Sequence, residues 1–330
     1  MLRGIAAIAT LILVLLAAFT FKSFTPPIFT ADAVAELTAL DVSGDRQFLL
    51  IRGQNRGAPV LLFLHGGPGM PAMYLAHDFQ RDLEELFVVV HWDQRGAGKS
   101  LKKDTDPASL TIAALLEDTD RVVDYLRERL DKESVWLVGH SHGSYLGALY
   151  ARRQPGKVRA FVGVGQVADF EREVGVQDAF LRSRLESLDL PANTEISSAN
   201  REDLLFQTGS ELYGETSFLP LIWSALMAPE YSLLDIMNVK RGSSFASAHM
   251  SYDGFSRNLI ADERDFEIPI AVIMGAHDMT TPLSLAREYY EAIEAPDKRW
   301  INLERAAHFP HFERPESFTD ALRELKAAWQ

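Results

Sequence analysis

The alternation of short apolar runs with segments of helical period constrains this chain more than any other feature of its sequence. The runs are apolar on both faces, and most are followed by a stretch with the three-to-four-residue period of an amphipathic helix. The runs cover residues 60–64, 87–92, 135–138, 158–164, 268–274 and 299–303, and the helical segments cover 74–86, 112–130, 144–153, 283–293 and 316–329. Strands of this kind, separated by helices, predict an α/β fold with a doubly wound, mostly parallel sheet covered on both faces.

Two regions depart from this alternation. Residues 35–42 and 47–52 alternate apolar and polar side chains around a Ser-Gly-Asp turn, which predicts an antiparallel hairpin. A long middle region has no apolar strand run but has helix-like stretches, so we expect a helical lid inserted between two parts of one sheet. The expected organisation is an N-terminal hydrophobic segment (1–24), a linker (25–34), the first part of the core (35–168), the lid (169–263, with helix-like stretches at 174–188, 202–213 and 218–227) and the second part of the core (264–330).

The N-terminus carries a candidate membrane segment. Residues 4–21 are 18 consecutive uncharged residues between Arg3 and Lys22, and a helix of that length spans about 27 Å, close to the hydrocarbon thickness of a bilayer. Phenylalanines occupy the stretch where a signal-peptide cleavage site needs small residues, which favours an uncleaved anchor over a cleaved signal or a buried helix. The flanking charges favour the N-terminus inside, with the catalytic part of the chain outside the cytoplasm, or secreted if the segment is cleaved.

Composition excludes several classes of protein and site. The chain has 33 Lys and Arg against 46 Asp and Glu, a formal net charge of −13, and nucleic-acid binding requires clustered basic residues, so no nucleic-acid partner is expected. The absence of cysteine excludes a disulfide framework, a thiolate nucleophile and a Cys-ligated metal. His140, His142, His277 and His308 lack the spacing of an H-E-x-x-H or comparable motif, so we expect no metal and no cofactor.

The string GHSHG at residues 139–143 indicates a candidate nucleophile, Ser141. It follows an apolar run and precedes a helical segment, and its glycines allow the sharp strand-to-helix turn that holds a reactive serine exposed. A serine hydroxyl is a weak nucleophile and needs a base within hydrogen-bond reach and a carboxylate that orients the base. The alternative interpretation is a glycine-rich turn with a solvated serine.

The acid and the base are expected after later strands. Asp278 follows the run 268–274 and His308 follows the run 299–303, in the chain order Ser, Asp, His that this kind of site uses. Both lie just past strand ends, where catalytic loops gather. His311 remains an alternative base, whereas His277 is more typical of a loop residue. Other carboxylates with a polar or proline-containing context, which favours solvated positions, are Asp262, Asp265 and Asp297.

The glycine cluster HGGPG at residues 65–69 predicts an oxyanion hole. It follows the first apolar run, so backbone N–H groups near Gly67 can point into the site without obstruction by side chains. The second donor is expected to be the backbone N–H of His142, the residue after the nucleophile. The alternative is a tight turn that merely needs glycine conformations.

These motifs together resemble those of the α/β-hydrolase superfamily, and specifically its proline iminopeptidase-like branch. The similarity covers residues 35–330 and is carried by HGGPG (65–69), DQRGAGKS (93–100), GHSHG (139–143), GAHD (275–278) and the late His308. The resemblance implies that Ser141 is the nucleophile, Asp278 the orienting acid and His308 the base. It further implies oxyanion donors at Gly67 and His142, and structural roles for Asp93 and Arg95.

The resemblance also implies an activity. It is that of a serine hydrolase acting through an acyl-enzyme, most specifically an aminopeptidase of proline iminopeptidase type that releases an N-terminal residue, in the first place proline, with a small molecule or a short peptide as substrate. Members of this branch bind the substrate's α-amine with lid glutamates, for which the candidates are Glu171, Glu173, Glu211 and Glu215. The chain departs from the branch where His142 replaces an aromatic residue. A carboxylesterase acting on small esters and a low-turnover small-molecule receptor remain alternatives.

Overall fold

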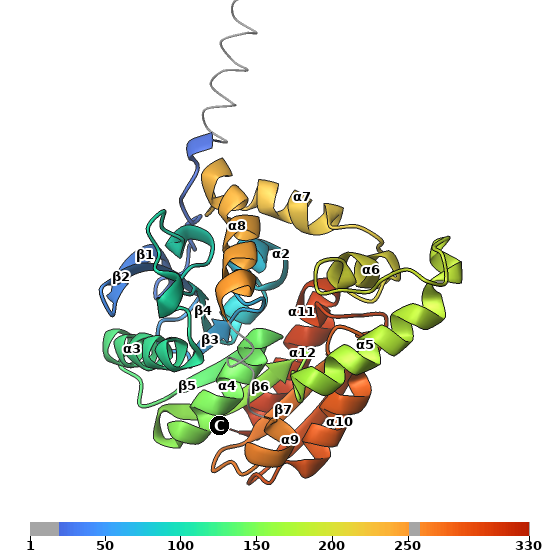
Figure 1. The fold of residues 1–330 in the computed structure, drawn as a ribbon. Coiled ribbons are helices and arrows are strands. Elements are labelled where there is room, and N and C mark those ends of the chain that lie inside the picture. Colours follow the sequence, from blue (N-terminus) through green and yellow to red (C-terminus); the bar gives the residue numbers. More distant parts are fainter. Residues whose placement is uncertain (1–19, 251–257, 330) are drawn as a thin grey trace, which may run out of the picture.

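The protein is built around one eight-stranded sheet, as a computed structural model that describes residues 20–250 and 258–329 shows (Figure 1). The strands are β1 (Val34–Val42), β2 (Asp45–Gly53), β3 (Val60–Leu64), β4 (Val88–Asp93), β5 (Val135–His140), β6 (Val158–Val164), β7 (Ile270–Gly275) and β8 (Lys298–Leu303), in the order β1-β2-β4-β3-β5-β6-β7-β8. β1 and β2 form an antiparallel hairpin, β2 pairs antiparallel with β4, and the remaining pairs are parallel. The predicted hairpin and the mostly parallel sheet are confirmed.

Helices cover both faces of the sheet, which explains the continuous apolar runs. In β3, Leu62 packs in one core cluster with α3 (Ile112–Leu130) and α4 (His142–Arg153). Its neighbour Phe63 packs in a second cluster with α2 (Ala76–Phe79) and α12 (Pro315–Ala328). Successive side chains of a strand point to opposite faces, so a strand buried on both faces must be apolar at every position.

The helix predicted over residues 74–86 is wrong as a single element. The chain instead makes three short pieces, η1 (Met73–Leu75), α2 and η2 (Leu83–Glu85). Apolar residues along this stretch are buried in a helix-like pattern, but the chain turns after α2 so that η2 reaches β2. There Arg52 Nε donates to Glu84 Oε1 at 2.7 Å, and Gln80 Nε2 donates to the same oxygen.

The predicted lid region is helical and lies between β6 and β7 in the chain. It contains α5 (Phe170–Arg184), α6 (Arg201–Gln207), α7 (Leu219–Met227), α8 (Leu233–His249) and α9 (Leu259–Asp262). Helix α8 has no counterpart among the predicted stretches, because its Ser, Gly and Ala residues form no clear apolar stripe. Its start is nevertheless encoded locally, since Ser232 and Asp235 form a reciprocal capping box. The exact lid boundaries stay predictions.

The predicted membrane segment, residues 4–21, lies almost entirely outside the described residues and stays a prediction. Within residues 20–250 and 258–329, no helix combines the length and the apolar character that crossing a bilayer requires. The chain that follows the segment contacts the lid. Lys22 donates to the carbonyl of Leu226, and the N–H of Phe24 donates to the carbonyl of Pro229 at 3.2 Å.

Candidate active site

Ser141 lies at a sharp turn between β5 and α4. Its backbone has φ 53° and ψ −122°, a left-handed conformation that is strained for any residue with a side chain. The flanking glycines are required by space: a Cβ at Gly139 would lie 2.2 Å from the carbonyl oxygen of Gly143, and a Cβ at Gly143 would lie 2.1 Å from that of Leu64. The turn therefore has the geometry of a nucleophile elbow.

Asp278 and His308 meet beside this turn. His308 Nδ1 lies 2.9 Å from Asp278 Oδ2, and both side chains are buried. The other carboxylate oxygen, Oδ1, accepts the N–H groups of Thr280 and Thr281, each at 2.9 Å. This arrangement fixes the carboxylate, which in turn selects the tautomer with a proton on His308 Nδ1 and leaves Nε2 free of that proton.

The charge of Asp278 controls the protonation of His308. Burial disfavours the imidazolium, but the charge and the hydrogen bond of Asp278 outweigh it and raise the pKa of His308 to about 9, with further help from Glu211 and Glu313. The backbone of His308 is also held in place. Its carbonyl accepts from His140 Nε2 at 2.7 Å, and its N–H donates to the carbonyl of Glu211 at 3.0 Å.

The alternative acids and bases are placed differently from Asp278 and His308, although His311 lines the same cavity as Ser141. His311 is fully buried between Phe63 and Phe79, with ring centroids 5.2 and 4.9 Å away, and burial lowers its pKa to about 3. His277 packs on the ring of Tyr213 in the lid. The alternative acids have other contacts. The backbone carbonyl of Asp262 accepts from Arg152, the backbone of Asp265 forms an isolated β-bridge with that of Glu294, and the carboxylate of Asp297 accepts from Trp329 and Arg299. The structure thus pairs Asp278 with His308 and with neither of the other histidines.

The glycine cluster after β3 lies directly against Ser141. A Cβ at Gly66 would sit 3.0 Å from Cβ of Ser141, and Gly67 has φ +109°, with a Cβ there 2.6 Å from the N atom of Met70. His142 is the first residue of α4, so its N–H belongs to the helix N-terminus beside Ser141. The His142 ring is buried, and burial lowers its pKa to about 3, so the ring is neutral.

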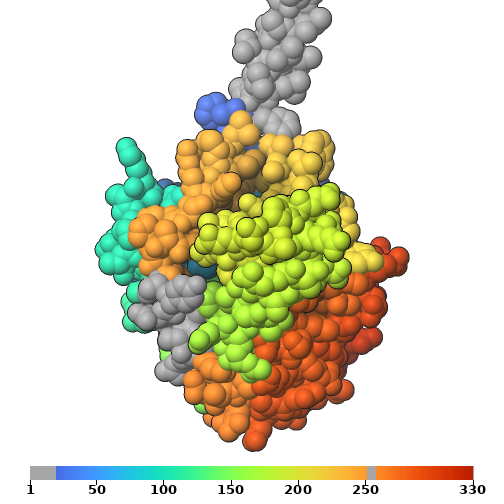
Figure 2. Space-filling view, turned by 45° about the vertical axis from the view of Figure 1, so that its right-hand side comes forward, coloured from blue at the N-terminus to red at the C-terminus, as the bar shows by residue number. Residues whose placement is uncertain are grey.

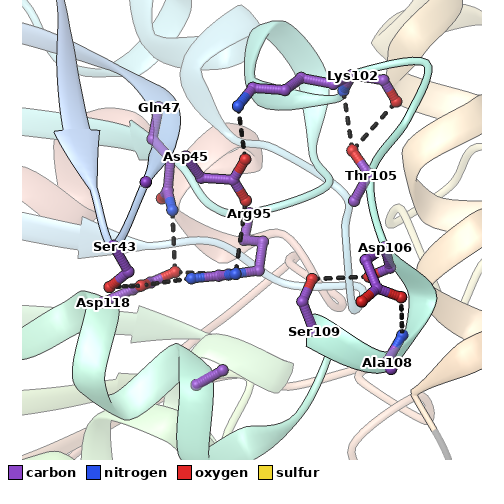
Figure 3. Close-up of polar contacts among 12 residues, drawn as sticks. Ser43, Asp45, Gln47, Arg95, Lys102, Thr105, Asp106, Ala108, Ser109 and Asp118 are labelled. Atoms are coloured by element: carbon purple, nitrogen blue, oxygen red, sulfur yellow. Dashed lines mark hydrogen bonds and ion pairs between the residues drawn. The ribbon is translucent and has the colours of Figure 1, made fainter.

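The loop DQRGAGKS after β4 is a structural brace, in agreement with the role that the resemblance implies. Arg95 donates to both oxygens of the buried Asp118 at 2.9 and 2.8 Å, and Ser43 and Gln47 from the hairpin donate to the same carboxylate (Figure 3). The loop is thereby tied to the hairpin and to α3.

The same loop contacts the lid through Asp93. Burial raises the pKa of Asp93 to about 7, and its Oδ2 accepts from the Tyr231 hydroxyl at 2.5 Å and from the N–H of Lys99 at 2.8 Å. Gly98 is required here, because a Cβ would lie 2.4 Å from Asp93 Oδ2. Lys99 Nζ reaches Asp235 at the start of α8, which fixes this end of the lid on the core.

A cavity of about 540 Å³ lies between the core and the lid and is lined by both Ser141 and His308. In the space-filling view, a hollow between α8 and the α5–α6 region has residues of the first half of the core at its base (Figure 2). The lid side supplies polar residues, among them Glu202, Glu211 and Ser243, together with apolar ones such as Phe170 and Leu205.

Two of the lining residues are carboxylates. Glu211 is buried, and burial raises its pKa to about 7, while the hydroxyl of Thr280 donates to its Oε1. Glu202 lines the cavity and is an exposed residue, and partial desolvation together with the charge of the neighbouring Asp203 raises the pKa of its carboxyl. Glu202 and Glu211 both interact electrostatically with His308, so both lie close to the predicted base.

Of the four predicted lid glutamates, only one lines the cavity in the part of the chain that the structure describes. Glu211 lines the cavity, as the prediction requires. Glu173 is buried at the start of α5, where its Oε1 accepts the N–H of Ala168 at 2.7 Å, and it does not line the cavity. Glu171 and Glu215 are exposed and also lie outside the cavity lining. Glu202 was missed, because no motif distinguishes it from other acidic residues in the first turn of a helix.

The described residues show no metal centre, since they contain no group of three or more His, Cys, Asp or Glu side chains that could hold an ion. The side chains that gather at the cavity instead form a serine, a histidine, a carboxylate and a row of backbone donors. That combination suits acyl transfer, in which charge develops on a carbonyl oxygen.

Comparisons with known proteins agree with this geometry. The profile of a family described as the alpha/beta hydrolase fold matches residues 59–315. A probable aminopeptidase, YbaC of Bacillus subtilis, is 30% identical over 304 residues, which cover 88% of this chain and 96% of that protein. A proline iminopeptidase of Heyndrickxia coagulans is 26% identical and covers 84% of this chain and 94% of its own. The crystal structure of a proline iminopeptidase-related protein, TTHA1809 of Thermus thermophilus, superposes with a TM-score of 0.63 at 24% identity, covering 90% and 98% of the two chains.

Proposed function

The chain belongs to the α/β-hydrolase fold family, in its proline iminopeptidase-like branch, and is a hydrolase; we propose that it is a serine aminopeptidase that releases the N-terminal residue of short peptides. In this proposal Ser141 is the nucleophile, His308 the general base and Asp278 the group that orients the base. The peptidase names of the relatives and the Asp278–His308 hydrogen bond of 2.9 Å support the assignment.

The proposed reaction has two acyl-transfer steps. His308 Nε2 takes the proton of the Ser141 hydroxyl as the oxygen attacks the carbonyl of the first residue, and the N–H groups of Gly67 and His142 stabilise the oxyanion. The imidazolium then gives its proton to the departing amine, so the peptide bond breaks and an ester to Ser141 remains. Water, deprotonated by His308, attacks that ester. The ester bond then breaks, the imidazolium returns the proton to the Ser141 oxygen, and the N-terminal residue leaves as the free amino acid.

The proposed specificity for peptides rests on two carboxylates, Glu202 and Glu211. They line the same cavity as Ser141 and His308. A free α-ammonium is a compact cation, and two carboxylates in the wall of one cavity form a site that favours it. An N-terminal residue bound in this way would present its carbonyl to the nucleophile, and blocked peptides would lack the anchoring charge. We therefore expect an exopeptidase with a requirement for a free amine.

Glu202→Gln and Glu211→Gln test this specificity. Each substitution should raise KM for proline p-nitroanilide by about tenfold or more, because it removes one charge from the ammonium site, with a smaller effect on kcat. Glu171→Gln and Glu215→Gln are matched controls on the exposed lid surface and should leave KM unchanged. If all four variants behave alike, the ammonium site is wrong.

A carboxylesterase is the second candidate, favoured by the apolar part of the lining, which includes Met70, Phe170 and Leu205. The two candidates separate in a panel of proline amides, Nα-acetylated amides and p-nitrophenyl esters, with Ser141→Ala as the control. Turnover of esters without detectable turnover of free-amine amides would remove the peptidase proposal. Labelling by a fluorophosphonate that persists in Ser141→Ala would contradict the nucleophile itself, and a wild-type protein that neither reacts nor turns over substrates would indicate a receptor.

A further inference from the structure

Helix α7 of the lid turns an apolar face to the outside of the protein. Leu219, Ile222, Trp223 and Met227 are 67, 50, 65 and 41% exposed, and their spacing places them along one side of the helix. The opposite side is buried in the second core cluster, through residues that include Leu221 and Ala225. We call the four exposed residues the α7 face. An exposed group of large apolar side chains of this kind marks an interaction surface.

The chain that leads to the predicted membrane segment runs beside this face. Lys22 donates to the carbonyl of Leu226 and the N–H of Phe24 to that of Pro229, so the start of the described chain is fixed next to the C-terminal end of α7 (Figure 1). Phe21, 79% exposed, is the last residue of the 18-residue uncharged run. The end of a segment long enough to cross a bilayer therefore lies beside the C-terminal end of α7, the helix that carries the α7 face.

The start of α8, the next helix, has the composition of a surface at the boundary of a membrane. Leu234 and Met237 are 55 and 50% exposed in its first turns, and the exposed basic residues Lys240 and Arg241 follow one turn later. Apolar side chains flanked by Lys, Arg and Trp are typical of helices that lie in the headgroup region of a lipid layer. The basic residues matter because the whole chain carries a net charge of −13.

From these observations we infer that the α7 face docks on the interfacial layer of a lipid bilayer, with residues 4–21 entering the same bilayer. This inference goes beyond hydrolysis, because it assigns the lid a second functional surface. The proposed reaction does not require that surface. The bilayer explains the α7 face better than a protein partner does, because the only covering layer that the sequence itself points to is the one that a long uncharged segment requires.

The absence of cysteine allows a direct test with single labelled positions in the full chain. Trp223→Cys and Met227→Cys, labelled with an environment-sensitive fluorophore, report on the α7 face, and Glu128→Cys on the exposed side of α3 is the control. The labelled proteins are reconstituted in vesicles of phosphatidylcholine and phosphatidylglycerol, with and without brominated acyl chains. Thermal melting confirms that each variant folds as the unlabelled protein does.

The expected result is quenching by brominated lipid at positions 223 and 227, together with at least about threefold protection from iodide in water, and neither effect at position 128. Equal behaviour at all three positions would overturn the inference. Protection from iodide without quenching by brominated lipid would also overturn it, because the face would then be covered by protein, either a second copy or residues 4–21. None of these outcomes changes the turnover measurements that test the proposed function.

Discussion

The two sides of the cavity that Ser141 and His308 line are determined by the sequence in different ways. On the core side, Ser141, Asp278 and His308 each follow the end of a parallel strand, so the sheet brings them to one edge. On the lid side, Glu202 and Glu211 lie in and after α6, and their distance from Ser141 depends on how the lid helices pack on the core. Local chain geometry thus fixes one half of the site, and long-range packing fixes the other.

The two sides also differ in electrostatic balance. In the core, the charge of Asp278 is matched by His308 and by backbone N–H groups. In the lid, Glu211 is buried against the hydroxyl of Thr280, a neutral donor, and its pKa is raised to about 7. The charge that favours ionised Glu211 comes from His308, whose imidazole is already hydrogen-bonded to Asp278, and a buried carboxylate that is only partly compensated is costly. The lid side is therefore the half of the cavity that gains most from a cation on the ligand.

The largest expected effect concerns the core side. Ser141→Ala should lower kcat for proline p-nitroanilide by about 10⁴-fold or more, because no acyl-enzyme can form. Ser141→Gly should be equally inactive but should melt at a higher temperature than Ser141→Ala, because glycine tolerates φ 53° and relieves the strain. Calorimetry and single-turnover kinetics measure both. Equal melting temperatures would show that the elbow stores no strain at this residue.

The next largest effect concerns the stability of the turn around Ser141 and not the reaction itself. Gly143→Ala should lower the free energy of unfolding by about 3 kcal/mol, because the new methyl group would lie 2.1 Å from the carbonyl oxygen of Leu64. Gly156→Ala is the matched control on the same core, since nothing lies within 4 Å of its Cβ position. Denaturant unfolding compares the two. A similar midpoint for both variants would contradict the role of close approach in shaping the turn.

This contrast between the core side and the lid side explains which parts of the structure could be predicted from the sequence. The sheet, the hairpin and the Asp278–His308 pair could be predicted, because apolar runs and the residues that follow them report strand ends directly. Helix α8 and Glu202 could not. The residues of α8 that approach the core are small, so they leave no apolar stripe, and Glu202 gains its place from the fold of the lid alone. The prediction of a single helix at 74–86 was wrong because the buried residues there are spaced as in a helix, whereas the chain forms three short helical pieces, with a turn after α2.

The pH dependence should separate the two sides of the cavity. His308 must be neutral to act as base, and its raised pKa of about 9 predicts that kcat/KM increases with pH up to that value, about tenfold per unit on the acid limb. Glu211 must be ionised to hold an ammonium, and its pKa of about 7 predicts a second limb at lower pH. Glu211→Gln should abolish the lower limb and shift the upper one to lower pH, because the charge of Glu211 helps to raise the pKa of His308.

Stability should change in the opposite direction to activity. His308 has its ordinary pKa of about 6.5 when unfolded and a raised one when folded, so its contribution to stability is complete below 6.5 and is lost as the pH rises through about 9. For Glu211 the corresponding loss begins near 4.5 and ends near 7. Thermal melting from pH 4 to 10 measures both windows. A melting temperature that increases between pH 7 and 9 would contradict the raised pKa of His308.

The smallest expected effects come from two glycines inside lid helices. Gly175 in α5 has nothing within 4 Å of its Cβ position, so Gly175→Ala should stabilise the protein by about 0.5–1 kcal/mol through backbone entropy alone. Gly242 in α8 gains the same helix preference, but its Cβ would lie 2.7 Å from the carbonyl oxygen of Gly96 and 3.1 Å from that of Gly69. Gly242→Ala should therefore lack that gain and lower kcat/KM about tenfold, because α8 would press on the loop that carries Gly67, the proposed oxyanion donor. Equal values of kcat/KM for the two variants would mean that the packing of α8 does not affect the position of the residues on the core side of the cavity.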